Sequence, residues 1–232
     1  MYILKKDFID ENTESYCAKG KKLSSGKAYF LKDKNGNIHF GGKQCAEMHG
    51  ANDLSQVPDL TKSLIARREG HLKGGSTTES SGNKNDLSKS QAVAYILLRE
   101  EKLSDYKIKG QSLSYDVLKN YYSEYNEHND LSEGSVSHIL NIENKASKAN
   151  KRLSLKNLST CYAYQYILER TIAALGAKDN AGGVSYVSDL LNGENGIKMH
   201  CSLTREQVYG LSKWLQFLPK DLRESRLREF DL

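Results

Sequence analysis

The chain has 232 residues, of which 38% are hydrophobic and 27% are charged, and this balance is typical of a soluble globular protein with a sizeable core. Its 34 lysines and arginines exceed its 29 acidic residues by five, which permits an anionic partner without requiring one. No apolar run approaches the roughly 18 residues of a membrane span, and charged residues interrupt the first ten positions, so we expect neither a membrane partner nor a signal peptide. The four cysteines are widely spaced, unlike a secreted disulfide framework, and we therefore expect a cytoplasmic protein with reduced thiols.

The N-terminal region contains the clearest hairpin signal. A strand-like segment at 27–32 is followed by an Asn-Gly turn, which supplies the positive φ values of a tight hairpin, and 37–40 forms the return strand. Two glycines break that strand, and 43–49 is expected to form a short helix that ends at Gly50.

Three residues of this region are candidate metal ligands. Cys45 and His49 lie four positions apart on the expected helix, so both side chains point to one face. Cys17 precedes the hairpin, and a hairpin followed by a helix that presents ligands is typical of treble-clef and ribbon zinc modules. Zinc modules usually supply their ligands in close pairs, however, and Cys17 has no partner within four residues. We therefore expect a module without a cofactor, in which Cys45 is a small buried hydrophobic residue. The alternative is one structural zinc held by Cys17, Cys45 and His49.

A polar stretch, KGGSTTESSGNKN at 73–85, divides the chain, because Gly/Ser-rich composition is typical of a flexible linker. We predict an α+β fold that is mostly α. A basic hairpin-plus-short-helix module at 1–72, resembling a zinc ribbon and with a second short helix at about 59–69, precedes a helical bundle at 86–232.

Beyond the linker the apolar spacing predicts helices throughout. Asp86 and Ser114 are expected to cap the first two helices, and Thr204 with Gln207 forms a capping box before a later one. The expected helices lie at about 86–103, 114–125, 132–151, 158–176, 184–191, 204–218 and from 219 onward.

Lysines gather in the N-terminal module. Between residues 19 and 43 there are seven lysines and a single acid, mixed with glycines, serines and aromatic residues, and such a surface can follow a phosphate backbone. Smaller basic clusters follow at 67–68 and 145–156, and amide side chains in the hairpin turn and at the helix start can donate to base edges. The alternative is an ordinary solvated surface. The candidate nucleic-acid-binding residues are Lys19, Lys21, Lys22, Lys27, Lys32, Lys34, Asn35, Lys43, Gln44, Arg67, Arg68, Lys145, Lys148, Lys151 and Arg152.

We find no sequence pattern of an enzyme. The chain has neither a GxxxxGK[ST] phosphate loop nor a GxSxG nucleophile motif. His128, Asn129 and His138 lack the spacing of a ββα metal nuclease and fall in a segment with helical periodicity. We therefore expect no catalytic activity.

Two cysteines, Cys17 and Cys45, flank the segment KAYFLKDKNGNIHF, and a helical region follows from Asp86. In this layout the chain resembles the Cas8-like large subunit of type IV CRISPR–Cas effector complexes, the plasmid-borne class. The resemblance implies a cytoplasmic, non-nuclease subunit of an antiviral-defence type of ribonucleoprotein. It would bind guide RNA, target DNA and other subunits, with an accessory helicase among the candidates, recognise a short flanking motif in duplex DNA and help to start strand separation.

Fourteen tyrosines, many of them at helical spacing, also favour a protein that packs against other subunits. Two alternatives remain: a free-standing DNA-binding or regulatory protein of a plasmid or phage, and a nuclease whose site has no recognisable motif.

Overall fold

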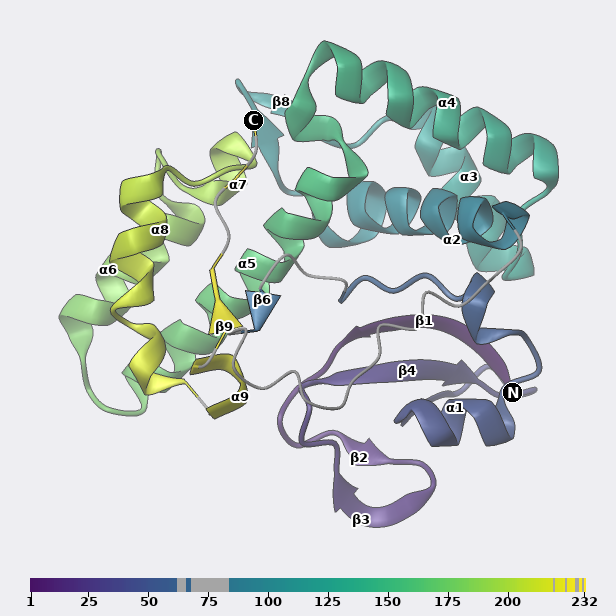
Figure 1. Cartoon of the computed structure of the whole chain (residues 1–232), viewed down its shortest axis with the longest axis horizontal. Coiled ribbons are helices and arrows are strands. Elements are labelled where there is room, and N and C mark those ends of the chain that lie inside the picture. The colour runs from purple at the N-terminus through teal and green to yellow at the C-terminus, as the bar shows by residue number, and fades with distance from the viewer. Residues whose placement is uncertain (62–65, 68–83, 219, 224, 228–229, 231) are drawn as a thin grey trace.

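The computed structural model describes residues 1–61, 66–67, 84–218, 220–223, 225–227, 230 and 232. It confirms the α+β, mostly helical fold, in which a small N-terminal sheet lies beside a larger helical part (Figure 1). Most of the expected linker, residues 73–83, lies outside the described residues, and positions 84 and 85 belong to the first long helix. The division into modules at 72 and 86 therefore stays a prediction.

The N-terminal sheet has three antiparallel strands in the order β1-β4-β5. Strand β1 (Tyr2–Phe8) pairs with β4 (Lys27–Lys32), which pairs in turn with β5 (Ile38–Gly41). The predicted hairpin is β4–β5, whereas β1 has no counterpart in the sequence-based prediction. Its inward positions include Lys5 and Asp7, so the usual alternation of apolar and polar residues is missing.

The β4–β5 turn differs from the predicted one, because only Gly36 has a positive φ, of 86°. The carboxylate of Asp33 accepts hydrogen bonds from the backbone N–H groups of Asn35 and Asn37, both at 2.8 Å. This carboxylate stabilises a longer loop with one left-handed residue. Helix α1 (Lys43–His49) follows and ends at Gly50, as predicted.

A second hairpin was not predicted. Strands β2 (Glu14–Ser15) and β3 (Ala18–Lys22) pair with an irregular register, and Figure 1 shows them projecting below the sheet, on the side away from the long helices. We call residues 14–22 the basic hairpin.

The helix predicted at 59–69 is wrong in its described part. A short 3-10 helix, η1 (Leu54–Gln56), comes earlier, and β6 (Ala66–Arg67) is a strand that pairs with β9 (Ser225–Arg226). Leu60 donates its backbone N–H to the carbonyl of Lys6, and Lys6 donates to Pro58, so this segment extends along β1 instead of coiling. Positions 62–65 and 68–69 lie outside the described residues.

The helical part follows the predicted order. Its long helices are α2 (Lys84–Ile96), α3 (Asp116–His128), α4 (Glu133–Ala149), α5 (Leu155–Gly176), α6 (Ala181–Asn192) and α8 (Arg205–Ser212). Shorter elements are the π-helical η2 (Leu97–Lys102), β7 (Lys107–Ile108), β8 (Gln111–Ser112), η3 (Lys151–Leu153), α7 (Ile197–His200), η4 (Leu215–Phe217) and α9 (Lys220–Arg223).

Two of the predicted helix starts are confirmed and two are wrong. Ser132 caps α4, and Thr204 forms the expected capping box of α8. Helix α2 begins before Asp86, and the N-cap of α3 is Tyr115, because the hydroxyl of Ser114 donates instead to Glu100 at 2.6 Å.

A buried group of charges joins the N-terminal sheet to the helical part. The carboxylate of Asp7, fully buried, lies 2.7 Å from Lys102 Nζ and accepts a 2.8 Å hydrogen bond from the Tyr162 hydroxyl. Lys5 Nζ lies 2.6 Å from the carboxylate of Glu101 and 3.5 Å from Asp7. We call these five residues the charged joint. Because Glu101 and Lys102 lie in the π-helical η2, the wider turn of that segment aims both side chains at β1.

The charged joint shifts the pKa of each helical partner in the direction that favours the observed pairs. Burial acts to lower the pKa of Lys102, but the carboxylates of Asp7 and Glu101 outweigh it and raise that pKa well above its usual range. Burial raises the pKa of the Tyr162 hydroxyl, and Asp7 raises it further. Burial alone would raise the pKa of Glu101, but Lys5 and Lys102 lower it.

Candidate nucleic-acid interface and cysteine centre

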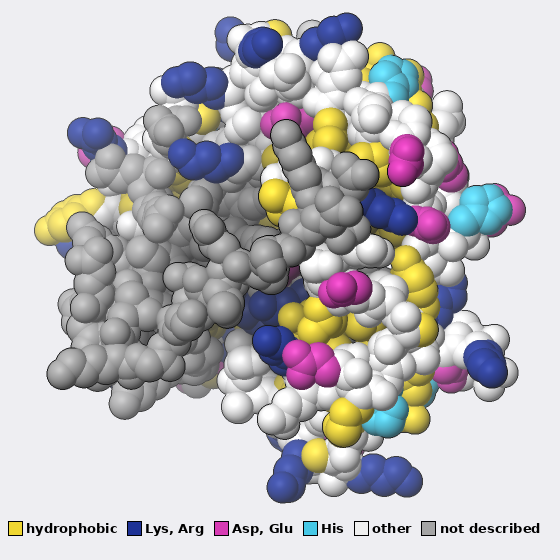
Figure 2. Space-filling view, turned by 45° about the vertical axis from the view of Figure 1, so that its right-hand side comes forward, with side chains coloured by type: hydrophobic (Ala, Val, Ile, Leu, Met, Phe, Trp, Pro, Cys, Tyr) yellow, Lys and Arg dark blue, Asp and Glu magenta, His cyan; other side chains and the backbone are white. Residues whose placement is uncertain are grey.

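The basic hairpin presents three lysines of the predicted set on one strand. Lys19, Lys21 and Lys22 lie on β3, and all three are exposed. Lys22 donates a hydrogen bond to the side chain of Asn12 at 2.6 Å. Gly20 has a φ of 75°, and this left-handed residue allows a β-bulge between Lys19 and Lys21. Figure 2 shows dark blue side chains at the bottom end of the molecule, where Figure 1 places β2 and β3.

The tip of this hairpin is the turn Tyr16–Cys17, which is anchored on β5 and α1. The backbone N–H of Tyr16 donates to the carbonyl of Phe40 at 2.8 Å. The Tyr16 ring, 41% exposed, lies 4.8 Å from the ring of His39 and 5.3 Å, edge to face, from that of His49. An exposed aromatic residue therefore precedes the exposed lysines Lys19 and Lys21 by three and five positions.

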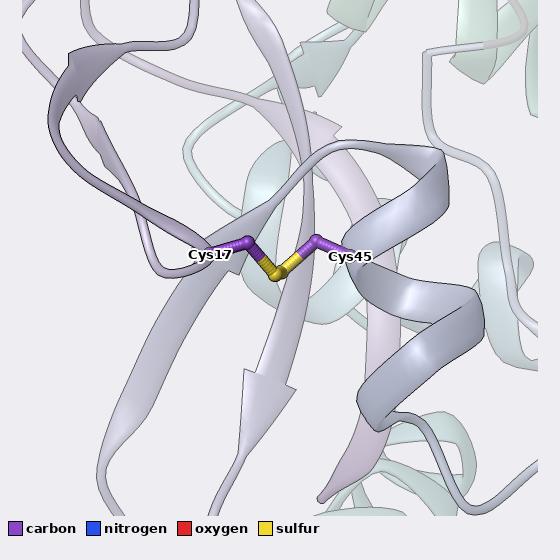
Figure 3. The surroundings of a disulfide bond; sticks show 2 residues. All are labelled: Cys17 and Cys45. Atoms are coloured by element: carbon purple, nitrogen blue, oxygen red, sulfur yellow. A yellow bond between two sulfur atoms is a disulfide. The ribbon is translucent and has the colours of Figure 1, made fainter.

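Cys17 at the tip is bonded to Cys45 on α1 (Figure 3). The expectation of reduced thiols throughout is wrong for this pair. The tip turn brings the two Cα atoms within 5.9 Å of each other although 28 positions separate them, and sequence spacing alone does not reveal this approach. The bond also depends on Gly41, since a Cβ there would lie only 2.7 Å from the sulfur of Cys45.

The structure does bring the three predicted zinc ligands together. The two cysteine sulfurs and a ring nitrogen of His49 lie within 4.8 Å of one another, with Cys45 buried and the other two residues exposed. Because two of the three ligands are joined in a disulfide, this form of the centre has no thiolates to offer a metal ion.

The remaining N-terminal candidates divide into two groups. Lys27 and Lys32 are half-buried and contact other parts of the chain. The Lys27 ammonium lies 5.6 Å from the Phe8 ring, and Lys32 donates a 3.2 Å hydrogen bond to Asn129, the C-cap residue of α3. Four further candidates are exposed, two in the β4–β5 turn and two at the start of α1. At the start of α1, the Lys43 ammonium lies 3.6 Å from the carboxylate of Glu47. These four are Lys34, Asn35, Lys43 and Gln44.

The predicted basic clusters do not form one surface. Lys145 and Lys148 lie near the end of α4, and Lys151 and Arg152 follow on η3. Figure 1 shows α4 at the opposite end of the molecule from β2 and β3. Arg67 lies on β6, and neither its side chain nor Arg68 is among the described parts of the chain.

The two histidines considered for catalysis lie on different helices. His128 is at the exposed end of α3, and the His138 ring on α4 is held by a 2.6 Å hydrogen bond with the Tyr121 hydroxyl. The charged joint was not predicted, because its only signal in the sequence is a lysine and an aspartate at inward positions of β1.

No family model matches the chain, and neither the curated proteins nor the solved structures compared with it show a significant similarity. Among the described residues, no helix has the length and hydrophobicity needed to cross a bilayer.

Proposed function

We propose that the chain binds the phosphate backbone of a nucleic acid through the basic hairpin. The observation that carries this proposal is the pair of exposed lysines Lys19 and Lys21, which share a hairpin with the exposed residue Tyr16. The tip of that hairpin is anchored by the Cys17–Cys45 bond. The role is one of binding and not of catalysis.

Two physical effects support this assignment. Ammonium groups on flexible stems neutralise phosphates and release condensed counterions, which favours binding at low salt. An exposed tyrosine ring adds a face on which an unpaired base can stack, and such stacking tolerates any base sequence. Because the tip of the hairpin is held by the disulfide and by the Tyr16 hydrogen bond, less conformational entropy is lost on binding.

The test compares two double variants of equal charge. Lys19→Ala with Lys21→Ala removes two of the three exposed lysines of β3, and Lys145→Ala with Lys148→Ala removes two exposed lysines of α4 at the other end of the molecule. Fluorescence anisotropy with labelled single strands, duplex DNA and RNA gives the affinity at several salt concentrations.

The β3 double variant should bind more weakly. The plot of log affinity against log salt concentration should become less steep by about 1.5, since each phosphate contact contributes roughly 0.7 to 0.9 to the magnitude of its slope. The α4 double variant should retain the wild-type slope. Equal slopes for the wild type and the β3 variant would contradict the proposal, and a loss confined to the α4 variant would move the interface to that end.

We further propose that this binding serves a cytoplasmic RNA-guided DNA-targeting complex, in which the chain contacts guide RNA, target DNA and other subunits. The support is the layout that resembles the Cas8-like subunit, together with the exposed basic hairpin. Purification of the tagged chain from its native host, followed by sequencing of bound RNA, tests this proposal. Short guide RNAs and co-purifying subunits are expected.

DNA binding by the isolated chain, without any bound RNA, would favour the alternative of a free-standing plasmid or phage regulator. The same anisotropy measurements decide between the two, because a regulator binds duplex DNA on its own with a preference for one sequence.

A further inference from the structure

The cysteine centre contains three ligand atoms of a kind that thiophilic divalent ions prefer. They come from the hairpin tip, where Cys17 lies, and from one face of α1, where Cys45 and His49 lie four residues apart. The three atoms are within 4.8 Å of one another. Ligands of a tetrahedral zinc ion lie roughly 3.3 to 3.8 Å apart, as follows from metal–ligand distances of about 2.0 to 2.3 Å. Side-chain shifts of about 1 Å would close that gap.

The positions of the three residues allow such shifts. Cys17 and His49 are exposed, and the His49 ring lies edge to face with Tyr16, also exposed, at 5.3 Å. Cys45, in contrast, is 4% exposed and is fixed by the packing of α1 against the sheet. One ligand is therefore rigid and two can adjust around it.

Charge favours a divalent ion once the disulfide is open. Two thiolates carry two negative charges, and a divalent ion neutralises both, whereas a bare thiolate at the buried Cys45 position would be costly. A neutral imidazole completes three protein ligands and leaves the fourth position to water.

We infer that Cys17, Cys45 and His49 form a redox-gated site for one thiophilic divalent metal ion, in which the disulfide and the metal-bound dithiolate are alternative states. A dithiol reductant supplies two electrons and two protons, breaks the sulfur–sulfur bond and is itself oxidised to a disulfide. The metal ion then replaces the two thiol protons, which are released to water. The two states exclude each other because both use the same two sulfurs.

The inference goes beyond nucleic-acid binding and does not depend on it. In an oxidising environment, the disulfide links the tip of the basic hairpin to α1. In a reducing environment, the metal ion makes the same link. Only the reduced, metal-free chain lacks a covalent or metal-mediated link between the tip and α1.

The experiment uses the full chain and Co²⁺ as a spectroscopic probe. One sample is reduced with a phosphine under argon and freed of reductant, and the other is left oxidised. The reduced chain should bind one Co²⁺ per chain with thiolate-to-cobalt charge-transfer absorption, and Zn²⁺ should displace it. The oxidised chain should show none of this absorption. Equal binding by both samples, or by neither, would overturn the inference.

Variants separate this centre from the other thiols. The free cysteines Cys161 and Cys201 are buried in the helical core, so Cys17→Ser should abolish the charge-transfer absorption although both of them remain. His49→Ala should weaken Co²⁺ binding at least about tenfold, as loss of a ligand costs no less than loss of an outer-shell partner. His128→Ala, on the exposed end of α3, is the matched control and should bind as the wild type does.

Circular dichroism of each variant checks that the helices are retained. Charge-transfer absorption that persists in a folded Cys17→Ser variant, or an unchanged affinity in His49→Ala, would place the metal elsewhere.

Discussion

The N-terminal sheet and the helical part are held together by different physical means. Among the described residues, the hydrophobic cluster of the helical part contains 33 buried side chains, whereas that of the sheet contains five, around Ile3, Leu31 and Cys45. A three-stranded sheet with so small an apolar core is marginal by itself. The sheet therefore depends on polar and covalent attachments, among them the charged joint toward the helices and the Cys17–Cys45 bond toward α1.

The largest effect is expected at the charged joint. Asp7→Asn removes the fully buried carboxylate and leaves the Lys102 ammonium with Glu101 alone. Because an uncompensated buried charge is costly, the free energy of unfolding should fall by about 3 to 5 kcal/mol. Urea denaturation followed by circular dichroism measures it.

The matched control is Lys119→Ala, which removes an exposed ion pair with Asp116 and should change stability by less than about 1 kcal/mol. If the free energy of unfolding falls by the same small amount in both variants, the charged joint contributes no more than a surface ion pair. The sheet would then not depend on it.

Loss of the disulfide should come second and should be confined to one region. Cys17→Ser opens a covalent loop across 28 positions, for which loop-closure entropy gives about 2 to 4 kcal/mol. Hydrogen exchange should increase in the basic hairpin and α1 and remain unchanged in α5. An equal increase in α5 would show that the two regions unfold as one unit.

The contribution of the charged joint to stability should be lost at both acidic and alkaline pH. The pKa of Glu101 is lowered from its ordinary 4.5, so its contribution is present above that pH and is lost as the pH falls through the folded-state value. The pKa values of Lys102 and Tyr162 are raised from 10.5 and 10.0, so their contributions are present below those pH values and are lost as the pH rises.

Melting temperatures measured from acidic to alkaline pH test both losses of stability. Glu101→Gln should flatten the acid side while the alkaline decrease persists. An unchanged acid side in that variant would assign the acid sensitivity to other carboxylates.

The smallest effect concerns base recognition at the edge of the N-terminal sheet. Lys34→Ala, Asn35→Ala and Gln44→Ala remove exposed donors in the β4–β5 turn and at the start of α1. If these donors contact base edges, each variant should lose a few-fold of discrimination between duplexes with different flanking bases. Binding to a library with randomised flanks measures this preference. Identical preferences in all three variants would leave these residues with a structural role alone.

Sequence reasoning succeeded where local chemistry decides the structure. The apolar spacing of α5, the capping box at Thr204 and the α1 stop at Gly50 depend on neighbours within a few positions, and all three are confirmed. It failed where distant residues decide. Lys5 and Asp7 have the inward positions of a strand but the composition of a solvated segment, because their partners lie on η2 and α5.

The candidate site was predicted in its residues but not in its arrangement. Cys17, Cys45 and His49 are adjacent as expected, yet the bond between the two cysteines depends on the unpredicted turn at Tyr16. Likewise, the seven-lysine stretch was counted as one surface, but Lys27 and Lys32 contact other parts of the chain and do not share the exposure of β3.

The close approach of Gly41 to Cys45 couples two positions in the history of the sequence. A Cβ at position 41 would lie 2.7 Å from the sulfur and 2.8 Å from the Cβ of Cys45, so a lineage has no room for a side chain at 41 as long as position 45 carries one. Glycine at position 41 should therefore persist among descendants of a common ancestor, including those that have lost Cys17. A side chain at position 41 is expected only in lineages in which α1 has moved away from the strand.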